Sequence, residues 1–262
     1  MTFLTVHRGD EPLIVSLPHT GTELPGKILP RLVSPRMALK DTDWRIDALY
    51  GFARDLGATT VHTALSRSAI DVNRDPFGLS LYPGQATTGL VPVETFDGEP
   101  LYRAGEAPGE AEIADRRERW FAPYHAALAQ EIARLAARHS RLVLYDCHSI
   151  RSRVPRLFEG ELPVFNVGTN GGTSCEAALR DAIVDACRRS GESLVIDGRF
   201  KGGFITRHYG APGRGVHAIQ MELAQRFYMD EERPQVPDEA RAGRAAAILK
   251  DALGAALAWA KA

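Results

Sequence analysis

Short hydrophobic runs alternate with longer amphipathic stretches along the chain. Short apolar runs that end at turn-forming or polar residues are typical of buried strands. The sequence predicts such strands over Leu13–Leu17, Thr59–Ala64, Arg141–Asp146, Ser193–Ile196 and His217–Leu223, with Ala69–Val72 as part of a further strand.

The amphipathic stretches predict helices between these strands. Residues 111–139 give the clearest pattern, because large apolar side chains recur there at helical spacing: Trp120, Tyr124, Leu128, Ile132 and Leu135. We also expect helices over residues 43–56, 174–190 and 238–260. Gly57 follows the first of these, and a glycine is common just beyond the end of a helix.

This order of elements predicts an α/β fold. Strands separated by helices form parallel pairs joined by crossovers, with helices on both faces of the sheet. Between residues 193 and 223 the strands follow each other closely, so we expect a mixed sheet. No repeat or linker divides the 262 residues, which predicts a single catalytic domain over residues 1–262. Prolines and glycines crowd residues 78–109, which predicts a long loop or lid.

Composition narrows the class of protein. The chain has 32 lysines and arginines against 33 aspartates and glutamates, so no basic excess favours nucleic acid. Its three cysteines have no CxxC spacing and predict neither a disulfide framework nor a thiolate zinc site. The first residues do not resemble a signal peptide, and no apolar run approaches ~18 residues. We therefore expect a soluble cytoplasmic enzyme with a small-molecule substrate and no membrane or nucleic-acid partner.

Polar residues gather where the predicted strands end, which is where ligands bind in open α/β sheets. His19 follows the first strand, His148 follows Arg141–Asp146, and Glu222 lies near the end of the last strand. A catalytic zinc ion typically takes two histidines and a carboxylate. Asp146 could orient His148 from behind. The alternative is that both histidines are hydrogen-bonded structural residues and that Asp146 caps a loop.

Two arginines flank the polar segment that follows the second strand. Arg67 and Arg74 bracket a short run of apolar and acidic residues, and Asn73 precedes Arg74. A planar guanidinium beside an amide suits the capture of a carboxylate. The alternative is that both arginines are solvated surface residues.

Together these segments are specific enough to indicate a family. The chain resembles the N-formylglutamate amidohydrolases, or deformylases, within the wider zinc carboxypeptidase and aspartoacylase-like group. The segments that carry the resemblance cover most of the chain: SLPHTGTELP (16–25), DTDWRIDALY (41–50), SRSAIDVNRDP (66–76), LYDCHS (144–149), NVGTNGGTSC (166–175), KGGFITRHYG (201–210) and HAIQMELAQRFYMDE (217–231).

The resemblance implies a fold, a reaction and a set of roles. The implied fold is a three-layer α/β/α domain with a mixed, mostly parallel sheet. The implied reaction is the hydrolysis of N-formyl-L-glutamate to formate and L-glutamate in histidine degradation. His19 and His148 match the two metal-binding histidines of the group, and Arg67 matches an arginine that polarises the scissile carbonyl. Asn73 with Arg74 matches a pair that grips a substrate carboxylate, and Glu222 matches the glutamate that acts on water.

The third metal ligand departs from the pattern of the group. The group spaces its first histidine and glutamate as HxxE, but Thr22 stands at that position here and Glu23 is one residue further on. Asp43 is the candidate that we favour, because the DTDW segment resembles a fixed feature of the deformylases and Pro25 disfavours a helical pairing of His19 with Glu23. Glu23 and Asp41 are the alternatives.

We therefore predict an amidohydrolase that uses one divalent metal ion, Zn²⁺ in the first instance. Because the substrate has a second carboxylate, a further cation is needed, and Arg207 after Gly202-Gly203 is the candidate. Two alternatives differ in class: a deacylase of another N-acyl amino acid or short peptide, and a metal-binding module that has lost turnover. The presence of Glu222 together with both histidines and Arg67 favours an enzyme over a metal-binding module that has lost turnover.

Overall fold

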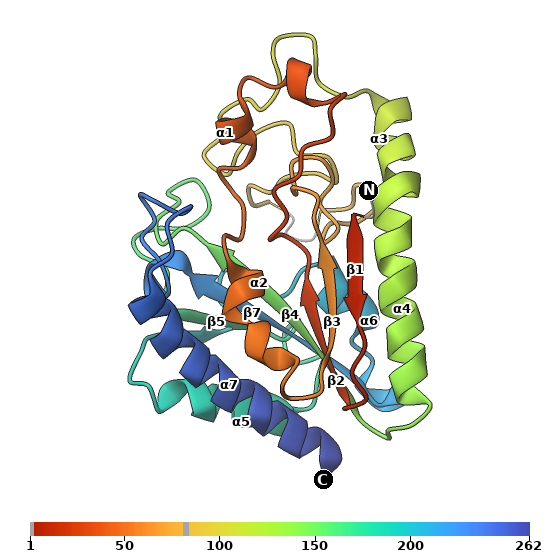
Figure 1. The fold of residues 1–262 in the computed structure, drawn as a ribbon, viewed down its shortest axis with the longest axis vertical. Coiled ribbons are helices and arrows are strands. Elements are labelled where there is room, and N and C mark those ends of the chain that lie inside the picture. The colour runs from red at the N-terminus through yellow and green to blue at the C-terminus, as the bar shows by residue number, and fades with distance from the viewer. Residues whose placement is uncertain (1–2, 81–83) are drawn as a thin grey trace.

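The centre of the molecule is a seven-stranded mixed sheet (Figure 1). The computed structural model describes residues 3–80 and 84–262. Within them the strand order is β1-β3-β2-β4-β7-β5-β6. The strands are β1 (Leu4–His7), β2 (Leu13–Leu17), β3 (Thr59–Thr63), β4 (Leu142–Ile150), β5 (Phe165–Gly168), β6 (Leu194–Ile196) and β7 (Val216–Ala224).

Most neighbouring strands are parallel. β3, β2, β4 and β7 run in one direction, whereas β1 is antiparallel to β3 and β5 is antiparallel to β7. The prediction of a mixed, mostly parallel sheet is confirmed. The reversed strands also include β6, which is parallel to β5. β1 and β5, each four residues long, were not among the predicted elements.

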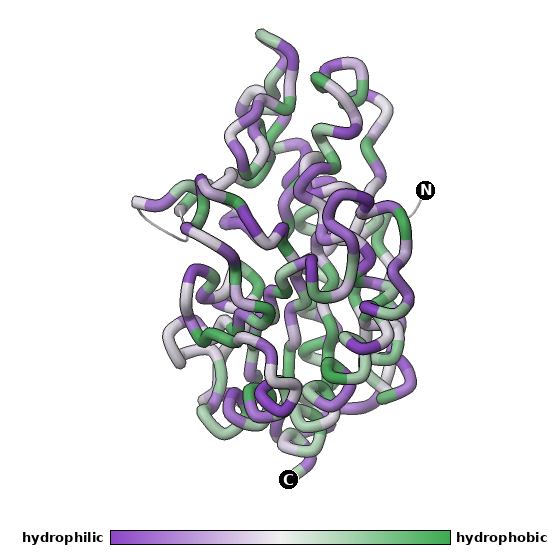
Figure 2. The backbone as a smooth tube through the Cα atoms, turned by 90° about the vertical axis from the view of Figure 1, so that its left-hand side faces the viewer, coloured by the Kyte–Doolittle hydropathy of each residue, from purple (hydrophilic) through white to green (hydrophobic). Residues whose placement is uncertain are grey.

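Helices cover both faces of this sheet, which confirms the three-layer prediction. On one face α5 (Ala177–Arg188) and α7 (Glu239–Lys261) pack in the same apolar cluster as Val143 and Tyr145 of β4. On the other face α4 (Ala122–Ala136) and α6 (Phe204–Tyr209) pack near Leu142 and Leu144. Figure 2 shows green hydrophobic stretches inside the body of the molecule and many purple hydrophilic ones along its outline.

Four of the predicted elements need correction. Residues 43–56 form only the short α2 (Ile46–Leu49) and a following 3₁₀ turn, because Arg45 has a φ of 58° and prevents a helix from starting at Asp43. Residues 69–72 are buried turns held by Ser66 rather than a strand. Residues 111–139 are helical as α3 (Glu110–Arg116) and α4, joined by a π-helical turn over Arg117–Phe121. β4 continues past residue 146 to Ile150.

One face of the central strands changes in polarity along its length. On the face toward α4, β4 presents Leu142 and Leu144, and then Asp146 and His148. Residues two apart on a strand lie on the same face, so β7 likewise continues from Ala218 to Gln220 and Glu222. The apolar half anchors the helices, and the polar half forms the floor of a site at the carboxyl ends of the strands.

Long loops rise above this edge of the sheet (Figure 1). The short α1 (Pro35–Ala38) lies in one of them. In the predicted lid, residues 78–80 and 84–109 contain turns and isolated bridges but no helix or strand, whereas residues 81–83 lie outside the described part. A long loop is therefore present, and its movement as a lid stays a prediction. In the described residues no helix has the length and apolarity needed to span a membrane.

Candidate active site

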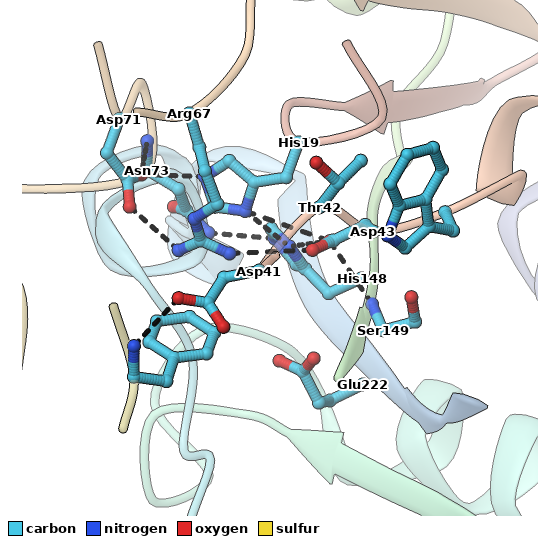
Figure 3. A network of polar contacts seen from close by, with 12 residues as sticks. His19, Asp41, Thr42, Asp43, Arg67, Asp71, Asn73, His148, Ser149 and Glu222 are labelled. Carbon is cyan, nitrogen blue, oxygen red and sulfur yellow. Dashed lines mark hydrogen bonds and ion pairs between the residues drawn. The ribbon is translucent and has the colours of Figure 1, made fainter. Parts of the chain in front are cut away.

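His19, Asp43 and His148 converge at the polar end of the sheet (Figure 3). His19 Nδ1 and His148 Nδ1 are 3.1 Å apart, and Asp43 Oδ2 lies 3.0 Å from His148 Nδ1 and 3.7 Å from His19 Nδ1. Two ligand atoms ~2.0–2.2 Å from one tetrahedral ion are separated by roughly 3.3–3.6 Å. These buried nitrogen and oxygen atoms therefore fit a shared divalent cation, and we call the three residues the triad.

Backbone hydrogen bonds bring Asp43 to the two histidines. Asp43 N donates to His19 O at 3.0 Å, and Ser149 N donates to Asp43 Oδ2 at 3.1 Å. The alternative ligands lie elsewhere: Glu23 is exposed, and the carboxylate of Asp41 accepts hydrogen bonds from Phe96 N and Arg151.

A second carboxylate contacts the outer nitrogen of each histidine. His19 Nε2 lies 2.6 Å from Asp71 Oδ1, and His148 Nε2 lies 2.9 Å from Asp146 Oδ2. A ring nitrogen that faces a carboxylate carries the proton, which leaves the other nitrogen free to ligate. Both Nδ1 lone pairs thus point toward Asp43. The orienting role predicted for Asp146 agrees with this contact, whereas the contact of Asp71 with His19 was not predicted.

The two histidines respond differently to their surroundings. Burial and the charge of Arg67 lower the pKa of His19 to about 4. Burial also disfavours the charged form of His148, but Asp146 and Asp43 outweigh it and raise the pKa of His148 well above the usual value. The carboxylates around His148 thus attract positive charge, which either a proton or a metal cation can supply.

Arg67 is buried between two of these carboxylates. Its Nη2 donates to Asp71 Oδ2 at 2.8 Å, its Nη1 lies 3.4 Å from Asp43 Oδ1, and the guanidinium lies 4.8 Å from the ring centroid of Phe96. Arg67 therefore links Asp71, behind His19, to Asp43 in the triad.

Glu222 lies beside the triad because of the strand register. β4 and β7 pair His148 with Glu222, and residues paired in this way project to the same face. Gln220 Nε2 donates to Glu222 Oε2 at 3.2 Å. Burial raises the pKa of Glu222 to about 8, against the opposing effects of His148 and Arg67.

Asn73 is held by internal hydrogen bonds. Its Nδ2 donates to Asp146 Oδ2 at 3.1 Å, and its Oδ1 accepts from Ile205 N at the start of α6. Gly203 packs so closely that a Cβ there would lie 2.3 Å from Asn73 Nδ2. Asn73 thus joins α6 to the Asp146–His148 pair.

Several of these groups border one cavity that is rich in arginine. Among the described residues that line it are Arg67, Arg74, Arg156 and Arg199, and the only carboxylate is Glu222. The other lining residues include His19, His148, Asn73 and Gln220. Arg207 does not line this cavity, and its Nε donates to Gly202 O at 2.9 Å. The excess of positive charge suits an anionic ligand.

Sequence reasoning identified the residues near the strand ends but not the more distant cavity wall. His19, Asp43, Arg67, Asn73, Arg74, His148 and Glu222 all come together here, as expected. Arg156 and Arg199 were not among the predicted residues. Their loops approach the cavity only through tertiary packing, so no local spacing marks them.

An α/β/α fold with a cluster of two histidines and a carboxylate beside a buried glutamate is the arrangement of a hydrolase. The family model for N-formylglutamate amidohydrolase matches residues 11–229. The chain belongs to this family.

Two curated relatives have closely similar sequences. N-formylglutamate deformylase of Pseudomonas aeruginosa is 48% identical over 261 residues, which is 98% of this chain and 96% of the relative. N-formylglutamate deformylase of Pseudomonas putida is 46% identical over 257 residues, again 98% and 96% of the two chains. The crystal structure of N-formylglutamate amidohydrolase from Ralstonia eutropha JMP134 has a TM-score of 0.82 at 24% identity and covers 100% of this chain and 98% of its own, which supports the fold.

Asp71→Asn tests how far the buried charges depend on each other. The change removes the negative charge that faces His19 and Arg67, and breaking a buried ion pair costs about 3–5 kcal/mol. We expect the free energy of unfolding, measured by urea denaturation in the presence of chelator, to fall by that amount. Asp115→Asn is the matched control, because Asp115 pairs with Arg119 at the exposed surface and such pairs contribute at most about 1 kcal/mol. Equal losses in the two variants would contradict this account.

Proposed function

We propose that this protein hydrolyses N-formyl-L-glutamate to formate and L-glutamate. The observation that carries the proposal is that His19 and His148 of the triad border one arginine-rich cavity together with Glu222, in a chain of the N-formylglutamate amidohydrolase family. The donors for a cation, a carboxyl group for proton transfer and cationic groups for an acidic substrate are thus together.

We assign the triad to one divalent metal ion and favour Zn²⁺. Two imidazoles and one carboxylate are a donor set of catalytic zinc, and the carboxylates behind both imidazoles strengthen them as ligands. When bound, such an ion would supply Lewis-acid polarisation of the formyl group and lower the pKa of a water molecule.

Glu222 is the group that moves the proton. In the hydrolysis, a water oxygen bonds to the formyl carbon, the C–N bond breaks, and a proton is transferred to the leaving nitrogen. Glu222 would accept the proton from water and deliver it to that nitrogen. Its pKa of about 8 suits a carboxyl that must both take up and release a proton near neutral pH.

Arg67 stabilises the charge that develops on the formyl oxygen. The guanidinium has five N–H donors in a fixed plane, and Asp43 and Asp71 hold this plane against the cavity. A donor that is already oriented costs little reorganisation during the reaction.

Arg74 would grip one carboxylate of the substrate. It lines the cavity. Its Nε donates to Thr88 O at 3.1 Å, and its Nη2 donates to Thr88 Oγ1 at 3.2 Å. The amide of Asn73 contacts Asp146 and α6, so we assign Asn73 to support of the site behind Arg74. Arg207, outside the cavity, loses its assignment to the second carboxylate.

The experiment that tests this function measures formate release from N-formylglutamate with and without a chelator. We expect turnover that the chelator abolishes and Zn²⁺ restores. A panel of N-formyl and N-acetyl amino acids and short peptides separates the alternatives. Faster release from another N-acyl compound would reassign the substrate, bound metal with no turnover would indicate a binding module, and turnover unaffected by complete metal removal would reject the metal.

Asp43→Asn and Glu23→Gln distinguish the two candidate ligands. Asp43→Asn removes a charged ligand, so we expect the affinity for Zn²⁺, measured by calorimetry, to fall by at least about 10–100-fold. Losses of this size are usual even when the mutated residue only hydrogen-bonds to a metal ligand. Glu23→Gln is the matched control and should bind nearly as the unmodified protein does. The reverse pattern would assign the third ligand to Glu23.

Glu222→Gln separates proton transfer from metal binding. Glutamine keeps the size and hydrogen bonding of the side chain but cannot accept the proton. We expect kcat to fall by ~10²–10⁴-fold while the metal content per chain, measured by elemental analysis, stays near its normal value. An unchanged kcat would refute the role, and a parallel loss of metal would make Glu222 a ligand instead.

A further inference from the structure

The hydrogen bonds behind His148 continue past Asp146 into the body of the protein. Asp146 Oδ1 accepts from Ser16 Oγ at 2.9 Å, and Ser16 Oγ lies 3.0 Å from Tyr124 Oη. A serine hydroxyl has one proton, which Ser16 donates to the carboxylate, so Tyr124 is the donor to Ser16. Donors therefore reach both oxygens of Asp146: His148 at Oδ2 and, at Oδ1, Ser16 with Tyr124 behind it.

Three separate elements supply these side chains. Ser16 of β2 is paired with Asp146 of β4 in the parallel register, so both side chains project to the same face of the sheet. α4 covers that face and supplies Tyr124 from its first turn. Ser16 is the only polar residue of β2, whose five residues are all buried, and a buried hydroxyl costs free energy unless it is hydrogen-bonded. The contact with Asp146 accounts for a serine in this apolar strand.

The hydrogen-bonded chain ends inside the protein. Tyr124 is fully buried, in an apolar cluster with Ile14, Leu128 and Leu144. Burial raises the pKa of the Tyr124 hydroxyl well above its usual value, so the group keeps its proton and remains a donor. A route for protons to solvent would need an exposed or titrating end. The geometry therefore suits holding Asp146 in one orientation rather than conducting protons.

The orientation of Asp146 matters because its two oxygens have different contacts. Oδ2 accepts from His148 Nε2 at 2.9 Å and from Asn73 Nδ2 at 3.1 Å, whereas Oδ1 accepts from Ser16. The last torsion of an aspartate side chain is broad, so a contact at both oxygens is needed to fix the carboxylate plane. A fixed plane keeps the proton of His148 on Nε2 and the lone pair of Nδ1 directed toward Asp43.

The carboxylate behind the other histidine is also held at both oxygens. Asp71 Oδ1 faces His19 Nε2 at 2.6 Å, and Asp71 Oδ2 accepts from Arg67 at 2.8 Å. Each histidine of the triad thus has a carboxylate behind it and a second donor on the far oxygen of that carboxylate. Behind His148 this second donor is the neutral Ser16.

We propose that Ser16 and Tyr124 are positioning residues, which fix Asp146 and through it His148 for the binding of a divalent cation. The inference rests on the proposed function in one respect, the assignment of the triad to a metal ion. Neither Ser16 nor Tyr124 lines the cavity. A change in either hydroxyl group therefore acts on the site only through Asp146.

The test measures the affinity for Zn²⁺ by calorimetry, with a competing chelator where binding is tight. Ser16→Ala leaves Asp146 Oδ1 without its donor, and we expect the affinity to fall by about 10-fold, the lower end of the loss for residues behind a metal ligand. Tyr124→Phe removes one oxygen atom and keeps the ring in the core. We expect a smaller loss there, because Ser16 still donates to Asp146. This nearly isosteric variant keeps the proposal testable if Ser16→Ala folds poorly.

A double variant separates positioning from a general effect on the core. If Ser16 acts through Asp146, Ser16→Ala should have no further effect on the affinity for Zn²⁺ in an Asp146→Asn background, because the effects of coupled residues do not add. An equal loss in the two backgrounds would overturn the proposal, as would an unchanged affinity in both Ser16→Ala and Tyr124→Phe.

Tyr145→Phe is the matched control. Tyr145 directly precedes Asp146 on β4 and is buried in the apolar cluster on the opposite face of the sheet, with residues of α5 and α7. The change removes a buried hydroxyl from the same strand without touching Ser16 or Tyr124, so Tyr145→Phe should bind Zn²⁺ as the unmodified protein does. A loss as large as that in Tyr124→Phe would show a general effect of buried hydroxyl groups and would overturn the proposal.

These outcomes are separable from turnover. Hydrolysis of N-formylglutamate with an affinity for Zn²⁺ that does not depend on Ser16 or Tyr124 would keep the proposed function and reject the positioning role. An affinity that depends on both residues, in a protein that releases no formate, would reject the function and keep the positioning role. If the unmodified protein binds no Zn²⁺, the positioning role fails together with the assignment of the triad, while formate release still decides the reaction.

Discussion

The register between β4 and β7 determines where most of the site lies. It sets His148 opposite Glu222, and Asp146 opposite Gln220, on the face of the sheet that is apolar nearer the start of the strands. A shift by one residue would turn each of these side chains to the opposite face, into the cluster that packs against α5 and α7. The apolar residues Leu142, Leu144 and Ala218 oppose such a shift, so the packing of the core holds the candidate site in register.

The buried charges stabilise one another only as a connected set. Asp43, Asp71 and Asp146 are fully buried, and each contacts a histidine. Arg67 joins two of these carboxylates, and Ser16 donates to the third at 2.9 Å. An isolated charge in such a place would be neutralised or expelled. Asp71 and Asp146 therefore lie behind the histidines, whereas positive charge dominates the cavity surface.

The fold class and the central part of the site could be predicted from the sequence. Short apolar runs indicate the buried strands. Residues at or just beyond the ends of parallel strands share one edge of the sheet, which is why His19, His148 and Glu222 could be predicted to lie together. Asp43 was expected at the start of a helix, but Arg45 at positive φ separates it from α2. Its place depends on the hydrogen bond from Asp43 N to His19 O, which has no local signal. Arg199 was not predicted for the same reason, because its partners Leu157 and Ala86 are distant from it in sequence.

The close approach of Gly203 to Asn73 also constrains how this sequence can change during evolution. A methyl group at residue 203 would collide with the amide that supports Asp146 and caps α6. A side chain can be accepted at residue 203 only after residue 73 has become smaller, and a smaller residue 73 first removes the support of His148. Each order of change passes through an impaired intermediate, so these two positions, 130 residues apart in the chain, are expected to be inherited as a unit.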